Sequence, residues 1–146
     1  MEYARRYFKE VSAIAEQIDL AVIEKMVTRI ESAKAARGRM FFLGVGGSAA
    51  NCTHAVNDFR KIGGMECYSP VDNVAEITAR TNDEGWHTVF APWLKCSHLS
   101  SRDIVFILSV GGGNREKNIS VNLIEALDFA KSVGATVLGI IGRDGG

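Results

Sequence analysis

The hydrophobic positions of residues 2–37 recur at steps of three and four, and this stretch contains no glycine or proline. The apolar series consists of Tyr7, Val11, Ile14, Ile18, Ala21, Val22, Met26 and Ile30. This spacing predicts one long amphipathic helix, or two helices with a joint at Ile18-Asp19, where Asp19 can cap the second. We expect another subunit to cover so long an apolar stripe; an ordinary helical layer within one subunit is the alternative.

After Gly38, short apolar runs alternate with helix-compatible segments. Strands are predicted over 40–44, 65–69, 103–109 and 136–141, and helices over 48–62, 74–80, 86–94 and 119–133. The run 103–109 is almost continuously β-branched and aromatic, which is typical of a central strand buried on both faces of a parallel sheet. The alternation predicts an α/β fold, a doubly wound parallel sheet of flavodoxin-like or Rossmann-like type with helices on both faces.

Two glycine-rich turns follow predicted strands, at the carboxyl edge where such sheets bind ligands. The first is Gly44-Val45-Gly46-Gly47, after which Ser48 can cap a helix, and the second is Val110-Gly111-Gly112-Gly113-Asn114. Backbone without side chains lets a ligand approach, and helix N–H groups attract an anion. The spacing matches neither the dinucleotide fingerprint nor a P-loop, and glycine turns of this kind also occur without a bound phosphate.

His54 and Asp58 follow the first turn and are one helical turn apart, so both side chains lie on one face of the predicted helix. We expect the two turns to form a pocket for an anion such as phosphate, and this pair to face into it. A solvated helix face is the alternative interpretation of the pair.

Composition narrows the possible functions. The chain has 146 residues, enough for one domain, and its 17 basic residues balance 17 acidic ones. This balance argues against a nucleic-acid partner and favours small-molecule chemistry. The three cysteines show no paired metal spacing and fit a reducing cytoplasm, and no apolar run reaches the length of a membrane span. We therefore expect a cytoplasmic protein with no membrane segment.

The run from Gly44 to His54, with Asp58, resembles the signature of the phosphoheptose isomerase group of sugar isomerase (SIS) domains. The usual family sequence there is Gly-Asn-Gly-Gly-Ser, then a His, then a Glu four residues later. The resemblance continues through 81–83, 111–114 and 137–146. It implies one SIS domain over 1–146, with N-terminal helices in 1–37 and an α/β core in 38–146. It also implies a homotetramer or dimer formed through the N-terminal helices, and a chain that lacks a C-terminal strand and helix.

The resemblance implies an aldose–ketose isomerase that converts sedoheptulose 7-phosphate to D-glycero-D-manno-heptose 7-phosphate for lipopolysaccharide and other surface polysaccharides. It assigns catalysis to Asp58 and His54, which can also hold a zinc ion in some family members. The substrate-binding residues implied by the resemblance or by the two turns are Gly46, Gly47, Ser48, Asn82, Asp83, Gly111, Gly112, Asn114 and Arg115.

Three features depart from the family motif. Val45 replaces an asparagine, Asp58 replaces a glutamate, and the second turn lacks the family's serines, although Arg115 follows it. A second interpretation therefore stays open: a non-catalytic SIS module that senses a phosphosugar or, like one relative of these isomerases, binds a replication initiator.

Overall fold

The computed structural model describes residues 1–145, which form two compact units, Met1–Glu31 and an α/β unit that begins at Ser32. The N-terminal segment contains two helices, α1 (Glu2–Gln17) and α2 (Leu20–Ala35). The side chain of Asp19 accepts a hydrogen bond from the Ala21 N–H at 2.9 Å. The two-helix prediction with an Asp19 cap is therefore confirmed.

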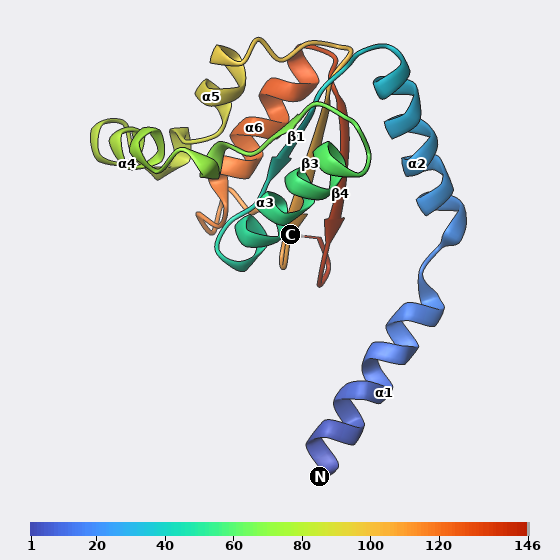
Figure 1. The fold of residues 1–146 in the computed structure, drawn as a ribbon. Coiled ribbons are helices and arrows are strands. Elements are labelled where there is room, and N and C mark those ends of the chain that lie inside the picture. The colour runs from blue at the N-terminus through green and yellow to red at the C-terminus, as the bar shows by residue number, and fades with distance from the viewer. Residues whose placement is uncertain (146) are drawn as a thin grey trace. The chain divides into compact units, whose positions relative to one another are not determined.

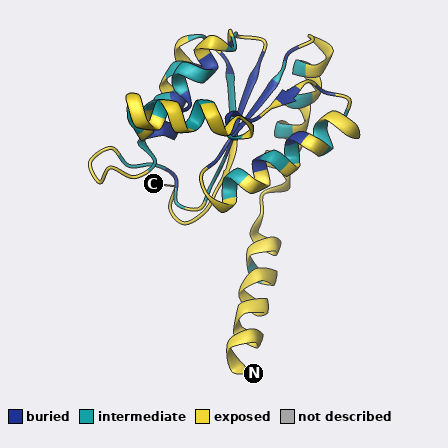
Figure 2. Ribbon diagram, turned by 60° about the vertical axis from the view of Figure 1, so that its left-hand side comes forward, coloured by how far each residue is buried: buried dark blue, intermediate teal, exposed yellow. Residues whose placement is uncertain are grey.

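Helix α1 has no buried residue. Its apolar side chains stand in solvent together with that of the joint, namely Tyr3, Tyr7, Phe8, Val11, Ile14 and Ile18. Tyr3 stacks on Tyr7, and Tyr7 meets Phe8 edge to face, so the aromatic rings cluster along one part of the helix. Figure 2 shows α1 almost entirely in the colour of exposed residues. The stripe predicted from the sequence is present and uncovered.

The α/β unit is built on four parallel strands in the order β2-β1-β3-β4, of which Figure 1 labels β1, β3 and β4. They are β1 (Met40–Leu43), β2 (Cys67–Tyr68), β3 (Ile104–Ser109) and β4 (Thr136–Ile141). The register pairs Met40 with Ile104 and Ile104 with Thr136, so the strands start together at one edge. The predicted parallel sheet is confirmed, with β1 and β3 at its centre.

Helices cover both faces of this sheet. Phe42 packs on Phe59 of α3 (Gly47–Lys61), with ring centroids 5.4 Å apart. Phe41 and Leu43 point to the other face, against α5 (Ala91–Cys96) and α6 (Val121–Ser132). The core on that face contains Phe41, Leu43, Val89, Phe90, Leu94, Leu99, Val105, Ile107, Leu123, Ala126, Ala130 and Ala135. Figure 2 shows buried residues concentrated on the strands between the helices, as the doubly wound prediction requires.

Two of the predicted helices differ from those observed. A 3-10 turn over Pro70–Asp72 leads into α4, which spans Val74–Asp83 instead of 74–80. The Arg80 carbonyl accepts N–H groups from Glu84 and Gly85, which closes α4 later than predicted. The segment 86–94 is a 3-10 turn over Trp86–Thr88, followed by α5 with Pro92 in its first turn.

The C-terminal third also departs from the prediction. Helix α6 begins at Val121 instead of 119, because Asn114 and Ile119 pair in an antiparallel bridge and fold residues 114–119 into a hairpin. Strand β4 is not fully buried as predicted. Ile140 and Ile141 are 60% and 40% exposed, because β4 pairs only with β3 among the described residues.

Candidate functional site

The first glycine turn joins β1 to α3 and leaves its backbone open. A Cβ on Gly44 would come within 2.7 Å of the Ser48 backbone, so only glycine lets α3 start this close to the strand. A Cβ on Gly46 or Gly47 would meet nothing within 4 Å. Gly46, rather than Ser48, is the N-cap residue of α3. Within residues 1–145, the N–H groups of Gly46 and Gly47 have no acceptor and are available to a ligand.

The second glycine turn, after β3, is closed by a serine. The Ser109 hydroxyl accepts a hydrogen bond from the Gly112 N–H at 3.0 Å, and the Ser109 carbonyl accepts the Gly142 N–H at 3.0 Å. The Arg143 guanidinium lies over Gly111, with Nη1 3.5 Å from where a Cβ would stand. Residues after β3 and after β4 therefore meet above the carboxyl edge of the sheet.

Between the two turns lies a hollow of about 230 Å³, which we call the crevice. Its lining is Val45, Ser48, Leu108, Ser109, Val110, Gly111, Gly112, Ile119, Ser120 and Arg143. It combines three hydroxyl groups, a guanidinium and glycine backbone beside the N-terminus of α3. This is a set of groups suited to an anion, since helix N–H groups and arginine are both strong partners for phosphate oxygens.

The sequence predicted some of the residues that line the crevice and missed others. Ser48, Gly111 and Gly112 were predicted and line the crevice, and Gly46 and Gly47 form the turn beside it. Ser109, Ser120 and Arg143 were missed. Ser120 immediately precedes the apolar stretch of α6, which is a helix-start signal, and Arg143 follows a predicted strand at its carboxyl end.

His54 and Asp58 lie on one face of α3, as predicted, with Nε2 and Oδ2 3.3 Å apart. Their side chains are 77% and 46% exposed and do not line the crevice. The expectation that this pair faces into the crevice is therefore wrong within this chain. An α-helix turns about 100° per residue, which places His54 roughly 120° around the helix from Ser48.

Asn82 and Asp83 are the last residues of helix α4, which was predicted to end at residue 80. Both are exposed, and the Asn82 amide donates to the Asp83 carboxylate at 2.8 Å. Neither residue lines the crevice.

Asn114 and Arg115 also lie outside the crevice lining. The Asn114 side chain accepts the Lys117 N–H at 2.8 Å, within the hairpin. Arg115 pairs with Glu125 at 2.6 Å and with Asp128, both on α6. Hydrogen bonds to Glu125 and Asp128 raise the pKa of the Arg115 guanidinium above its usual value. The structure thus directs Arg115 at two carboxylates and not at the crevice.

The residues described here offer an incomplete set of metal ligands. His54 and Asp58 supply two donors, and no group of three or more His, Cys, Asp or Glu side chains gathers within residues 1–145. A structural or catalytic zinc ion takes three or four protein donors. Burial raises the pKa of the Cys52 and Cys67 thiols to about 11, which disfavours the thiolate that binds a metal.

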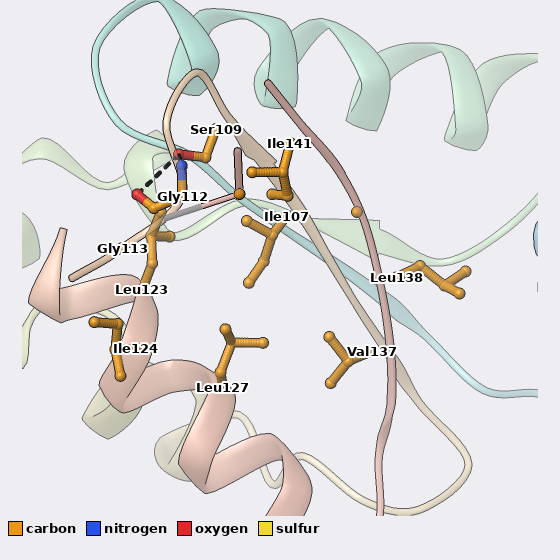
Figure 3. Close-up of a pocket in the computed structure, with 12 residues that line it drawn as sticks. Ile107, Ser109, Gly112, Gly113, Leu123, Ile124, Leu127, Val137, Leu138 and Ile141 are labelled. Carbon is orange, nitrogen blue, oxygen red and sulfur yellow. Dashed lines mark hydrogen bonds between the residues drawn. The ribbon is translucent and has the colours of Figure 1, made fainter. Parts of the chain in front are cut away.

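A second hollow, of about 320 Å³, lies between α6 and β4 (Figure 3). Apolar side chains fill most of its wall, including Ile107, Leu127 and Val137, and Ser109 is its one polar side chain among the described residues. It meets the crevice at Ser109 and Gly112. Because it offers no charge to an anion, the crevice is the candidate site. In the described part of the chain, no helix is long and apolar enough to cross a bilayer.

Comparison with known proteins identifies relatives over most of the chain, although no protein-family model matches it. It is 33% identical to the lincomycin biosynthesis protein LmbN of Streptomyces lincolnensis over 121 residues, covering 76% of this chain and 42% of that protein. It is 28% identical to a probable phosphoheptose isomerase of Thermoplasma volcanium, covering 96% of this chain and 70% of the relative.

Solved structures of phosphoheptose isomerases share the fold of this chain. The phosphoheptose isomerase GmhA from Neisseria gonorrhoeae superposes with a TM-score of 0.86 at 25% identity, covering 99% of this chain and 77% of that one. A phosphoheptose isomerase from Francisella tularensis shares the fold, with a TM-score of 0.83 at 19% identity. From the sequence relatives and the shared fold, the chain belongs to the phosphoheptose isomerase family of SIS domains.

Proposed function

We propose that this protein is a phosphosugar aldose–ketose isomerase that converts sedoheptulose 7-phosphate to D-glycero-D-manno-heptose 7-phosphate in the cytoplasm, for surface-polysaccharide synthesis. The observation that carries the proposal is the crevice, in which hydroxyl groups and a guanidinium surround open glycine backbone on the fold of this family. Relatives described as phosphoheptose isomerases support the choice of substrate class.

In this proposal the crevice holds the phosphate group. The free N–H groups of Gly46 and Gly47 donate to its oxygens at the positive end of the α3 dipole. The hydroxyls of Ser48 and Ser120 add donors, and Arg143 supplies a positive charge. None of these groups takes part in the chemical step; they anchor one end of the sugar.

Isomerisation requires a base that removes a proton from the carbon next to the carbonyl, and an acid that protonates the carbonyl oxygen to give an enediol. His54 and Asp58 are the candidates, because they are paired on one face of α3, the helix that begins at the first glycine turn. His54 stands about 9 Å further along the helix axis than Ser48, within reach of an extended seven-carbon chain anchored by its phosphate. The proposal routes no step through a metal, and a zinc ion at His54 and Asp58 would need further donors from elsewhere.

The exposure of His54 and Asp58 argues for a cover during catalysis, because water weakens the electrostatic interactions on which proton transfer depends. We include in the proposal a dimer or tetramer formed through the N-terminal helices. The uncovered apolar stripe of α1 supports it, since an apolar patch of this kind marks an interaction surface.

The test is an assay of the full chain with sedoheptulose 7-phosphate, with aldose formation as the readout. We expect turnover in the wild type, and a loss of about a hundredfold or more in Asp58→Asn with phosphate binding unchanged. Glu66→Gln, which neutralises an exposed carboxylate just before β2 and outside the crevice lining, is the matched control and should keep full activity.

A non-catalytic phosphosugar-binding protein is the second candidate, and one observation favours it: His54 and Asp58 lie outside the crevice. Binding of sedoheptulose 7-phosphate without any aldose formation would select this candidate. Turnover that depends on Asp58 would exclude it.

A further inference from the structure

The hairpin over residues 114–119 carries one wall of the crevice. Asn114 and Ile119 exchange backbone hydrogen bonds, each 2.9 Å long, which close the hairpin. Ile119 and the next residue, Ser120, both line the crevice. The hairpin therefore positions Ile119 directly and leads straight into Ser120, the N-cap residue of α6.

The end of the hairpin has an unfavourable backbone conformation. Asn118 and Ser120 have φ angles of 53° and 46°, in the left-handed region that residues other than glycine rarely adopt. Residues in this region keep their conformation only where the surrounding structure fixes it. The hairpin therefore needs contacts outside itself to hold Ser120 at the crevice.

Helix α6 supplies those contacts at the base and at the tip of the hairpin. At the base, Gly113 lies so close to Ile124 that a Cβ would come within 2.7 Å of its Cγ1, and the Leu123 N–H donates to the Ser120 carbonyl at 3.0 Å. At the tip, the two terminal nitrogens of Arg115 bind Glu125 and Asp128 separately.

Glu125 and Asp128 are three residues apart and so share one face of α6. A rigid, planar guanidinium can bridge two such carboxylates, which a single ammonium group cannot match in geometry. We call Arg115, Glu125 and Asp128 the latch. Among the side-chain interactions of the described residues, the latch is the one that connects the hairpin tip to the body of the α/β unit.

We propose that Arg115 is a positioning residue: the latch holds the 114–119 hairpin against α6 and thereby places Ser120 for anion binding in the crevice. The inference rests on the proposed function only in taking the crevice as the phosphate site. It assigns to Arg115 a role different from direct substrate contact.

Two sets of variants separate positioning from direct contact, with the affinity of the full-length protein for inorganic phosphate as the readout. Arg115→Gln removes the cation, whereas Glu125→Gln combined with Asp128→Asn removes its partners and frees the guanidinium. A positioning role predicts that both weaken phosphate binding, each by about fivefold. Direct contact predicts that the double variant binds phosphate more tightly, because two negative charges are lost and Arg115 is released.

Lys117→Gln is the matched control, because it removes one positive charge from the same hairpin at an exposed side chain outside the latch. It should leave phosphate affinity unchanged within twofold, a change expected of an exposed surface charge. Amide hydrogen exchange over residues 114–120 should accelerate in both latch variants and not in Lys117→Gln.

Tighter phosphate binding by the double variant would overturn the proposal, as would unchanged exchange in the hairpin or a wild type that binds no phosphate. Weaker binding by both latch variants, in a protein without isomerase turnover, would support the latch and overturn only the proposed activity. The failures of the two proposals are therefore distinguishable.

Discussion

The two edges of the sheet differ in whether their polar groups have partners within the protein. At the amino edge, Arg39 and Asp103 form a clasp just before β1 and β3. Asp103 is 2% exposed and accepts hydrogen bonds from the backbone and side chain of Arg39 and of Ser100, at 2.8–3.2 Å. The remaining Arg39 donors bind the carbonyls of Ser97 and His98. At the carboxyl edge, the N–H groups of the first glycine turn have no protein partner among the described residues.

The difference indicates that the amino edge of the sheet contributes to stability and the carboxyl edge to ligand binding. A buried carboxylate is tolerated when its charge is paired and its lone pairs are filled, and such a pair is costly to break. Donors left open beside a hollow contribute nothing to folding, but they are available to a ligand. We therefore expect changes at the amino edge to alter stability, and changes at the carboxyl edge to alter phosphate binding.

The largest effect is expected from Asp103→Ala, which leaves Arg39 and Ser100 without their shared acceptor. It should lower the free energy of unfolding by about 3–5 kcal/mol in a denaturant titration, while the folded fraction still binds phosphate. Glu84→Gln is the control, because Glu84 pairs with Arg80 at an exposed site and 3.7 Å distance. Its cost should stay below about 1 kcal/mol. Equal costs for the two variants would refute the assignment of stability to the clasp.

Arg143→Gln addresses the other edge. Losing a charged donor should weaken phosphate binding about tenfold, as measured by calorimetric titration. The free energy of unfolding should change by less than about 0.5 kcal/mol, as for other surface substitutions. Arg102→Gln removes an exposed arginine near the amino edge and should leave binding unchanged. If both variants lost affinity equally, general charge attraction and not the crevice would explain the binding.

Ser120→Gly should separate stability from binding at a single position. Glycine adopts a φ of 46° without penalty, so the free energy of unfolding should rise by up to about 1 kcal/mol. The lost hydroxyl should weaken phosphate binding about fivefold. Ser120→Ala also removes the hydroxyl but keeps the strained backbone, so it should match the affinity loss without the gain in stability. A Ser120→Gly variant with unchanged affinity would remove Ser120 from the site.

The smallest effect concerns acid stability. Burial alone would raise the pKa of Asp103, but hydrogen bonds from Arg39 and Ser100 outweigh it and hold the pKa below the ordinary value of 3.8. The carboxylate therefore stabilises the fold above about pH 4, and this contribution is lost as pH falls through the lowered pKa. Urea titrations from pH 6 to pH 2.5 should show a gap between wild type and Asp103→Asn that narrows only below pH 4. A constant gap would mean that Asp103 is not ionised in the folded protein.

The sequence was sufficient to predict the sheet. Runs such as 103–109 and 136–141 have the composition of parallel strands, and those strands appear within one residue of the predicted bounds. Helix ends were less predictable where side chains decide them. Helix α4 runs on to Asp83, and Arg80 within it pairs with Glu76 and Glu84 one turn before and after it. No local pattern reveals in advance that such contacts outweigh a loop-like composition.

The site was only partly predictable for a similar reason. Glycine turns after strands indicate a ligand edge, which identified Ser48, Gly111 and Gly112. Ser120 lies at the crevice where the 114–119 hairpin leads into α6, and the contacts of Arg115 with α6 span ten or more residues, which no local pattern reveals. The spacing from Ser48 gives the angle of His54 around α3. It does not tell on which side of α3 the crevice lies, so the direction of His54 relative to the crevice could not be predicted.

The most direct test of the account is an NMR titration of the full chain with inorganic phosphate, following each backbone amide. The account predicts saturable shifts at the crevice and its two turns, centred on Gly46, Gly47, Gly111, Gly112 and Ser120, with the clasp amides of Arg39 and Ser100 unmoved. Shifts centred on the apolar hollow or the amino edge, or no saturable shift at all, would contradict it.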